Sequence, residues 1–360
     1  MKTCETTSKN YIEINGRRVG PGYPVYTVAE ISANHNQRYD DAVKLIQVAS
    51  EIGADAVKVQ TYTADTLTID SDQEYFRIKG GTLWDGRTLY KLYREAYTPW
   101  EWQPKLKEIA NRLGLDFFSS AFDPTSVDFL EQMNVPVHKV ASFELVDIPL
   151  IEKMARTGKP LILSTGMATL EEIQEAVTAA RNAGAKQILL LKCTSAYPAP
   201  PEEMNLLTIP HLASHFRLPV GLSDHTLGTS IAIAAVTLGA CMVEQHFILS
   251  RSISGPDSAF SMEPQEFKAM VEAIRTVEKA LGRPSYGVSQ SEKKGLVFRR
   301  SLFAVKDVRT GETLTSENVR SIRPAHGLAP KFLKEILGRR ASCDIARGTP
   351  LQRGHIEGFQ

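Results

Sequence analysis

The sequence is poor in cysteine, with four among 360 residues: Cys4, Cys193, Cys241 and Cys343. They lie far apart and form no C-x-x-C pair, which argues against a zinc ribbon or a disulfide scaffold and favours a reducing compartment. An excess of one charge is also missing, because 42 Lys and Arg face 41 Asp and Glu for a formal net charge of +1. This balance gives no electrostatic reason to expect nucleic acid or an acidic membrane surface as a partner.

Long apolar segments are absent as well. Residues 1–15 contain no apolar core of the signal-peptide type. The longest uncharged stretch, residues 226–243, is rich in Ala, Thr and Gly, and is typical of a helix that stops at Gly239 and a following strand rather than of a membrane span. Since 42% of the residues are hydrophobic, the chain can build a large core, and we expect a soluble cytoplasmic protein.

An alternation of short apolar runs and amphipathic helical segments extends from about residue 24 to residue 282. One helix is expected at 40–52, with Gly53 as its C-terminal cap, and another at 171–183 before Gly184. Eight strands are predicted, at 25–30, 56–60, 115–120, 137–142, 160–165, 187–194, 219–224 and 240–246. Eight strands with helices between them predict a (β/α)8 TIM barrel.

A doubly wound open sheet is the competing architecture. Such a sheet usually has fewer strands and often a Gly-rich phosphate loop after the first one. Neither G-x-G-x-x-G nor G-x-x-x-x-G-K-[ST] occurs in this sequence, which favours the barrel.

The alternation stops after Gly282, which predicts three parts: a catalytic barrel at 1–282, a polar linker at 283–296 and a small β-rich domain at 297–360. The last part contains a weak internal repeat, since residues 307–311 (DVRTG) and 344–348 (DIARG) share a D-[VI]-x-x-G pattern offset by 37 residues. A domain of about 60 residues is near the lower limit for independent stability, so we expect it to be stabilised by packing against the barrel or against a second subunit.

The connection between the second and third strands, residues 61–100, is too long for an ordinary βα loop. It contains YFRIKGG at 75–81 and LWDGR at 83–87. A loop so rich in aromatic residues on the catalytic face suits a substrate lid. A dimer contact or a helical decoration fits the same residues equally well.

Ionisable side chains occur at the carboxyl ends of the predicted strands, where TIM barrels place their active sites. Lys58 and Lys139 interrupt otherwise apolar runs, and burying an ammonium without an anion costs several kcal/mol. Each lysine either pairs with a glutamate inside the barrel or helps to hold an anionic ligand. Lys192 also stands near a strand end, and Ser and Thr hydroxyls surround these positions as donors for a phosphate or carboxylate.

His225 and His246 end the seventh and eighth strands, which are neighbours in a closed barrel. Two imidazoles there could share a divalent cation or act as acid and base groups, and the residues alone leave both readings open. Glu30 and Glu244 are further candidates for acid–base chemistry. Asp257 lies in a Pro-Asp pair, which by itself indicates ordinary turn chemistry.

Seven segments resemble motifs of the sialic acid synthase family, and the resemblance as a whole extends over nearly the whole chain after about residue 20. They are AEISANHN (29–36), VKVQT (57–61), HKVASFE (138–144), LSTGM (163–167), KCTSAYP (192–198), GLSDHT (221–226) and EQHF (244–247). SIRP (321–324) and LGRRA (337–341) resemble the antifreeze-like (SAF) domain that closes those enzymes. The resemblance implies a TIM barrel followed by a SAF domain.

Within that family, residues 80–87, 96–102 and 140–144 are similar to the branch that makes pseudaminic acid. That branch condenses phosphoenolpyruvate with 2,4-diacetamido-2,4,6-trideoxy-L-altrose and releases phosphate by C–O cleavage. Sister branches that make N-acetylneuraminic or legionaminic acid are the nearest alternatives. Two others are a Schiff-base aldolase that uses Lys58 or Lys139 on pyruvate, and a non-catalytic sugar-binding protein.

The resemblance also implies roles for individual residues. His225 and His246 would hold Mn²⁺ or Mg²⁺, Glu30 matches an acid–base position, and Glu244 remains the second catalytic carboxylate. Phosphoenolpyruvate would be bound by Lys58, Gln60, Ser120, Lys139, Ser142, Ser164, Ser195 and Ser223, although Ser195 stands where the neuraminate branch has Asn. The sugar would be contacted by Glu144, Tyr197, Asp257 and Arg323. In the family, the arginine at the position of Arg323 reaches the partner's active site in a domain-swapped homodimer.

Overall fold

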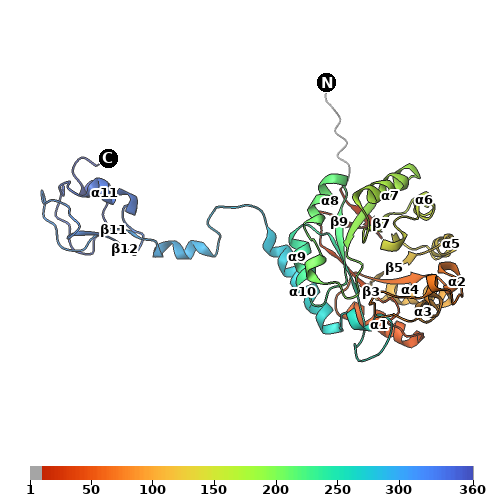
Figure 1. The fold of residues 1–360 in the computed structure, drawn as a ribbon. Coiled ribbons are helices and arrows are strands. Elements are labelled where there is room, and N and C mark those ends of the chain that lie inside the picture. Colours follow the sequence, from red (N-terminus) through yellow and green to blue (C-terminus); the bar gives the residue numbers. More distant parts are fainter. Residues whose placement is uncertain (1–9, 360) are drawn as a thin grey trace, which may run out of the picture. The chain divides into compact units, whose positions relative to one another are not determined.

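The computed structural model describes residues 10–359 and divides the chain into two compact units, Met1–Gly282 and Arg283–Gln360 (Figure 1). In the first unit, parallel strands close into a barrel in the order β10-β3-β4-β5-β6-β7-β8-β9. The strands are β3 (Tyr26–Glu30), β4 (Ala56–Thr61), β5 (Asp116–Ala121), β6 (His138–Val140), β7 (Leu161–Ser164), β8 (Ile188–Cys193), β9 (Val220–Asp224) and β10 (Met242–His246). The predicted TIM barrel is confirmed.

Helices surround the barrel strands, as Figure 1 shows. They are α1 (Tyr39–Glu51), α4 (Gln103–Arg112), α5 (Pro124–Gln132), α6 (Ile148–Arg156), α7 (Leu170–Asn182), α8 (Thr208–Phe216), α9 (Ser230–Thr237) and α10 (Pro264–Leu281). The α1 helix buries Ala42, Leu45, Ile46 and Ala49 against the barrel, the face that its apolar spacing predicts. Gly53 follows it at a φ of +83°, a backbone conformation that favours glycine. None of the helices between residues 10 and 359 is long and apolar enough to cross a membrane.

The amino-terminal half of the barrel interior is apolar and is filled by a hairpin that the sequence did not predict. Strands β1 (Ile12–Ile14) and β2 (Arg17–Val19) pair antiparallel. Their Ile12, Ile14 and Val19 side chains are fully buried in one cluster with residues at the beginnings of the barrel strands, such as Tyr26 and Met242. Because this end is filled, polar groups inside the barrel collect at the carboxyl ends of the strands.

The β6 strand is shorter than its predicted range of 137–142. It ends at Val140, and residues Ser142–Glu144 form a single 3-10 turn, η3, in which Glu144 N donates to Ala141 O at 3.1 Å. Ser142 and Glu144 therefore lie on a loop beyond the strand rather than in it.

The long connection after β4 folds into short helices, α2 (Ala64–Leu67), η1 (Glu74–Phe76), α3 (Leu89–Ala96) and η2 (Trp100–Trp102). Between η1 and α3 the chain doubles back, because Arg77 and Thr88 form an antiparallel bridge. We call residues 77–88 the insertion hairpin. Its tip carries Trp84.

The second unit contains the antiparallel pair β11 (Ser301–Ala304) and β12 (Val319–Ile322), the short helix α11 (Leu333–Ile336) and a core of its own around Leu302 and Leu351. The two repeat segments pair with each other through reciprocal bonds. Thr310 N donates to Asp344 Oδ1 and Arg347 N donates to Asp307 Oδ1, each at 2.7 Å.

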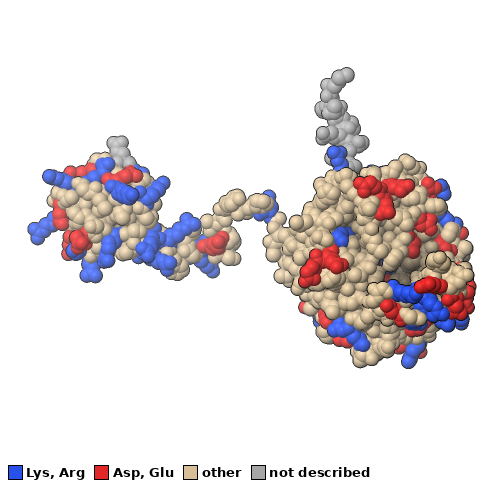
Figure 2. Space-filling model, viewed as in Figure 1, with Lys and Arg blue, Asp and Glu red and all other residues tan. Residues whose placement is uncertain are grey.

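Lys and Arg crowd the surface of this second unit (Figure 2). Residues 283–360 hold 15 Lys and Arg against 7 Asp and Glu, a net charge of +8. Residues 1–282 hold 27 against 34, a net charge of −7. The near-neutral net charge of the whole chain is therefore the sum of two units with opposite net charges.

Candidate active site

Four charged side chains lie inside the carboxyl-terminal half of the barrel. Glu30, Lys58, Lys139 and Glu244 come from β3, β4, β6 and β10, and none of them is more than 5% exposed. Lys58 Nζ forms an ion pair with Glu30 and lies 3.7 Å from Glu244 Oε1, while Lys139 Nζ lies 3.5 Å from that same oxygen. The internal pairing that the sequence left open is therefore present, and it offsets the cost of burying both ammonium groups.

Hydroxyl groups complete the surroundings of the lysines. Lys58 Nζ donates to Ser120 Oγ at 3.2 Å, and Lys139 Nζ donates to Ser164 Oγ at 2.8 Å. Ser223 Oγ donates to Glu244 Oε1 at 3.1 Å. Gln60 stands beside Ser120 in the register of β4 and β5. Most of the predicted anion-binding residues thus occupy one region of the barrel interior.

The two glutamates titrate differently because their charged neighbours differ. Burial, reinforced by the nearby Glu244 carboxylate, raises the pKa of Glu30 to about 7 in spite of Lys58. Burial also acts on Glu244, but the attraction of Lys139 and Lys58 outweighs it and lowers the pKa of Glu244. Such a divergence suits one carboxyl group to proton transfer and the other to a permanent charge. With Glu30 neutral, Lys58, Lys139 and Glu244 carry a net charge of +1, which favours an anion.

A second group of donors lies on the loops that follow β6, β7 and β8. Gly166 N donates to Ser142 Oγ at 3.2 Å. A Cβ atom at position 166 would come within 2.7 Å of Ser142 Oγ and still closer to Ser195 Oγ. Only glycine therefore lets these two hydroxyls approach each other, and the three residues form a compact donor set of the kind that cradles a phosphate.

His225 and His246 face each other at the ends of β9 and β10, with ring centroids 5.3 Å apart. His225 Nδ1 lies 2.9 Å from Thr194 O, which makes this nitrogen the donor and leaves Nε2 unprotonated in the neutral ring. His246 Nδ1 is buried and has no hydrogen-bond partner among residues 10–359. Burial lowers the pKa of His246 well below its ordinary value, so the ring is neutral at pH 7.

Asp257 contributes more than a turn. Its Oδ2 lies 3.9 Å from His246 Nδ1 and accepts hydrogen bonds from Ser32 Oγ and, at 3.3 Å, from Ala33 N. The side chain is buried, and burial raises its pKa. The turn-only reading drawn from the Pro-Asp pair is therefore incomplete.

Two facing imidazoles, when neutral, offer unprotonated nitrogens that suit a divalent cation and leave its other positions open for substrate oxygens. Among residues 10–359, however, no group of three or more His, Cys, Asp and Glu side chains is close enough to hold a metal. The residues present thus fit a cation held by two protein ligands and completed by substrate or water.

Aromatic rings border the histidines. The Tyr197 ring lies 4.4 Å from that of His225 and 5.1 Å from that of Phe260, and burial raises the pKa of Tyr197. Trp84, from the insertion hairpin, packs against Tyr197 at 5.7 Å. These contacts bring the insertion hairpin to the mouth of the barrel.

Glu144, Arg323 and Lys192 are the remaining candidate residues. Glu144 sits on η3, where burial raises its pKa to about 7. Arg323 belongs to the second unit. Lys192 alternates with Leu189 and Leu191, which lie in the barrel interior, so it points away from the interior and donates to Cys193 O at 2.7 Å. Its expected place at the active site was wrong, because side chains alternate along a strand.

Sequence reasoning missed the parts played by Ser32, Trp84 and Gly166. Ser32 lies two residues after the end of β3, and that position was a usable signal. The contacts of Trp84 and Gly166 depend on loops from distant parts of the chain, and no local pattern indicates them.

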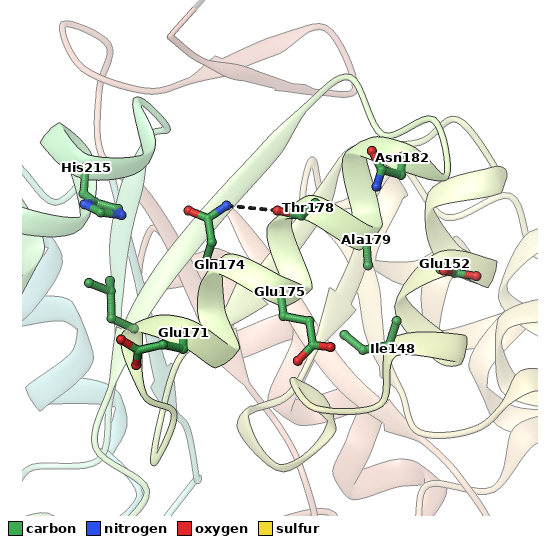
Figure 3. A pocket seen from close by; sticks show the side chains of 10 residues that line it. Ile148, Glu152, Glu171, Gln174, Glu175, Thr178, Ala179, Asn182 and His215 are labelled. Carbon is green, nitrogen blue, oxygen red and sulfur yellow. Dashed lines mark hydrogen bonds between the residues drawn. The ribbon is translucent and has the colours of Figure 1, made fainter.

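A groove of about 650 Å³ lies on the outer side of α6 and α7 (Figure 3). Glu171, Gln174 and Glu175 project into it from α7, with Glu152 and His215 at its sides. Its described lining includes no Lys or Arg and none of the predicted site residues. An acidic groove of this kind does not suit an anionic substrate, so the barrel mouth remains the candidate active site.

Comparison with known proteins identifies the family of the chain. Residues 45–286 match the model of the NeuB family, and residues 299–357 match that of the SAF domain. The chain is 48% identical to the pseudaminic acid synthase of Helicobacter pylori over 93% of this chain and 98% of that protein. It is 37% identical to the N,N'-diacetyllegionaminic acid synthase of Legionella pneumophila over 96% of this chain and 98% of that protein.

The fold matches that of a solved relative. The spore coat polysaccharide biosynthesis protein spsE of Bacillus subtilis superimposes with a TM-score of 0.66 at 31% identity, over 96% of this chain and 99% of that one. The predicted resemblance is confirmed by these matches, and the chain belongs to the NeuB family.

Proposed function

We propose that this protein is a transferase that condenses phosphoenolpyruvate with 2,4-diacetamido-2,4,6-trideoxy-L-altrose to give pseudaminic acid and phosphate. The observation that carries the proposal is the 48% identity, over almost the full length of both chains, to a pseudaminic acid synthase. The lower identity of 37% to a legionaminic acid synthase favours this sugar over that of the sister branch. We also propose that the protein is cytoplasmic, as expected from the sequence.

Phosphoenolpyruvate would bind across the two donor groups. Its carboxylate and phosphate need several N–H and O–H donors, and Lys58, Lys139, Ser120 and Ser164 supply them inside the barrel. Ser142, Gly166 and Ser195 supply more on the loops. The net charge of +1 that remains when Glu30 is neutral supports the binding of an anion.

The reaction requires a proton at two points, and Glu30 is suited to both. The enol carbon of phosphoenolpyruvate attacks the aldehyde carbon of the open-chain sugar, and neutral Glu30 donates its proton to the aldehyde oxygen. Positive charge then develops at C2 as an oxocarbenium-like centre. Water adds to C2, and one of its protons passes to the Glu30 carboxylate. The tetrahedral intermediate then collapses to the ketone: its C–O bond to phosphate breaks, and the proton of the C2 hydroxyl leaves with the phosphate. The pKa of about 7 lets Glu30 act as acid and then as base.

The proposed cofactor is a divalent cation, Mn²⁺ or Mg²⁺, held by His225 and His246. When bound, such a cation polarises the aldehyde carbonyl. The unpartnered His246 Nδ1 and the Thr194 carbonyl that orients His225 support this assignment. Asp257 and Tyr197 would position the sugar beside the imidazoles, and Glu144 would contact it from η3.

The proposed assembly is a domain-swapped homodimer in which Arg323 completes the active site of the partner. The opposite net charges of residues 1–282 and 283–360 support an attraction between the first unit of one chain and the second unit of another. Mixing the variants Arg323→Ala and Lys139→Ala tests it. If each is inactive alone, a swapped dimer regains activity on mixing because one of its two sites is then intact, and no recovery contradicts the swap.

The function itself is tested by a panel of sugars. The purified protein is given phosphoenolpyruvate with 2,4-diacetamido-2,4,6-trideoxy-L-altrose, with the legionaminic acid precursor or with N-acetylmannosamine, and phosphate release is followed. We expect release with the first sugar. Turnover of N-acetylmannosamine alone contradicts the proposal. Borohydride in the presence of pyruvate should leave the protein unlabelled, which separates it from a Schiff-base aldolase.

A further inference from the structure

The insertion hairpin touches the candidate active site through the indole of Trp84. The Trp84 ring centroid lies 5.7 Å from that of Tyr197, with an interplanar angle of 57°. Its Nε1 donates to Pro256 O at 2.9 Å. Pro256 directly precedes Asp257, and the Tyr197 ring packs at a tilt against that of His225. Trp84 therefore joins two loops that carry sugar-binding candidates.

The hairpin has a defined shape although most of its tip is exposed. The Asp85 carboxylate accepts bonds from Gly81 N at 2.8 Å and from Thr82 N at 2.9 Å, which ties the tip together. Arg77 and Thr88 pair at its base. Leu83, next to Trp84, is 52% exposed, whereas Trp84 is half-buried against Tyr197 and Pro256. The Trp84 indole is thus turned inward from a solvent-exposed tip.

The chemistry of the indole determines what it can offer a ligand. Its single N–H already bonds to Pro256 O, so only the faces and edges of the ring remain. Tyr197 and Phe260, whose rings are 5.1 Å apart, extend this apolar surface toward the histidines. Binding sites combine aromatic walls with a few polar groups that fix orientation, and here the polar groups lie in the barrel beneath.

We propose that Trp84 is a specificity-determining residue that forms an apolar wall of the sugar subsite and packs against the deoxygenated C6 methyl group of the substrate. This inference rests on the proposed function, because it takes the 6-deoxy sugar as the ligand. It assigns to the insertion hairpin a direct part in substrate choice. The hairpin would then be neither a plain helical decoration nor only a dimer contact.

Three variants test the wall: Trp84→Ala, Trp84→Phe and, as a matched control, Leu83→Ala on the neighbouring exposed position. Losing an aromatic contact should raise the KM for the sugar about tenfold in Trp84→Ala. Trp84→Phe keeps a ring but loses the bond to Pro256, so its KM should rise less. The KM for phosphoenolpyruvate should stay within about twofold in all three. Equal rises in both KM values, or an unchanged KM for the sugar in Trp84→Ala, overturn the inference.

Two further readouts separate a wall from a general structural role. The preference of the wild type for the 6-deoxy sugar over its 6-hydroxy analogue should shrink in Trp84→Ala, and an unchanged ratio overturns the inference. The unreactive alditol of the sugar, added with phosphoenolpyruvate, should alter the tryptophan fluorescence of the wild type but not of Trp84→Phe. An equal change in both also overturns it.

Failure of the proposed function can be distinguished from failure of this inference. If the wild type does not turn over the 6-deoxy sugar, the function is wrong and the inference falls with it. If the wild type is active and the Trp84 variants behave like Leu83→Ala, only the inference is wrong.

Discussion

Replacing Gly166 by alanine should impair phosphoenolpyruvate binding with little effect on folding. The added Cβ would lie 2.7 Å from Ser142 Oγ and 3.0 Å from Ser142 Cβ, and closer still to Ser195 Oγ. Ordinary van der Waals contact begins at 3.4 Å. The two hydroxyls must therefore move away from each other, by roughly 0.7 Å or more for Ser142.

The size of the effect follows from that displacement. A shift of this size lengthens an ideal hydrogen bond of about 2.8 Å to about 3.5 Å, where it is effectively lost. A hydrogen bond to a charged group is worth about 1.5–3 kcal/mol. Losing one such bond to the phosphate, at about 2 kcal/mol, corresponds to an increase of about 30-fold in the KM for phosphoenolpyruvate.

The assay is phosphate release, with phosphoenolpyruvate titrated at saturating sugar. Gly295→Ala is the control, because a Cβ atom there would meet nothing within 4 Å. Thermal unfolding, followed by tryptophan fluorescence, should be nearly unchanged in Gly166→Ala, since the obstructing atoms belong to side chains that can rotate. A KM for phosphoenolpyruvate within threefold of the wild-type value would refute the idea that Ser142 and Ser195 cradle the phosphate. So would an equal rise in the KM for the sugar.

Three further predictions concern stability and metal dependence. Burial lowers the pKa of His35 to about 4, below its unfolded value of about 6.5, so protons bind the unfolded chain first as the pH falls. The free energy of unfolding, measured by urea denaturation, should therefore drop by about 2 kcal/mol between pH 7 and pH 5. An equal drop over this pH range in His35→Gln contradicts the prediction. Lys58→Met breaks a buried ion pair and should lower the free energy of unfolding by about 3 kcal/mol, measured by urea denaturation. Lys153→Met, which removes a surface ion pair, should lower it by less than about 1 kcal/mol. Similar losses in the two variants argue against the buried pairing. A chelator should abolish turnover, and added Mn²⁺ should restore it. His246→Ala should stay inactive with Mn²⁺, whereas His215→Ala should behave like the wild type. Activity that survives both chelation and His246→Ala contradicts the proposed metal site.

Much of the barrel could be predicted because strands and helices leave local patterns. Apolar runs of four to eight residues marked every barrel strand, and the spacing of Ala42, Leu45, Ile46 and Ala49 identified the buried face of α1. The residues at which the strands end were predicted less accurately. The β6 strand stops at Val140 because the chain turns there into η3, and a turn set by neighbouring loops has no strong local signal.

The candidate site was predicted in part. Lys58 and Lys139 stood out as charges within apolar runs, and His225 and His246 as imidazoles on neighbouring strands. Their partners could not be read from the chain, since Glu244 is more than 100 residues away from either lysine and becomes adjacent only when the barrel closes. The same holds for Trp84 and Pro256, which lie 172 residues apart.

The sequence by itself determined the alternation of strands and helices, the end of the barrel at which the candidate site lies and the family to which the chain belongs. These follow from periodicity and from short motifs, which act over a few residues. Only the tertiary structure decided that two lysines share one glutamate, that a hairpin fills the amino-terminal end of the barrel and that the insertion hairpin reaches the mouth. Such contacts join segments far apart in the chain, so their geometry exists only after the fold has brought the segments together.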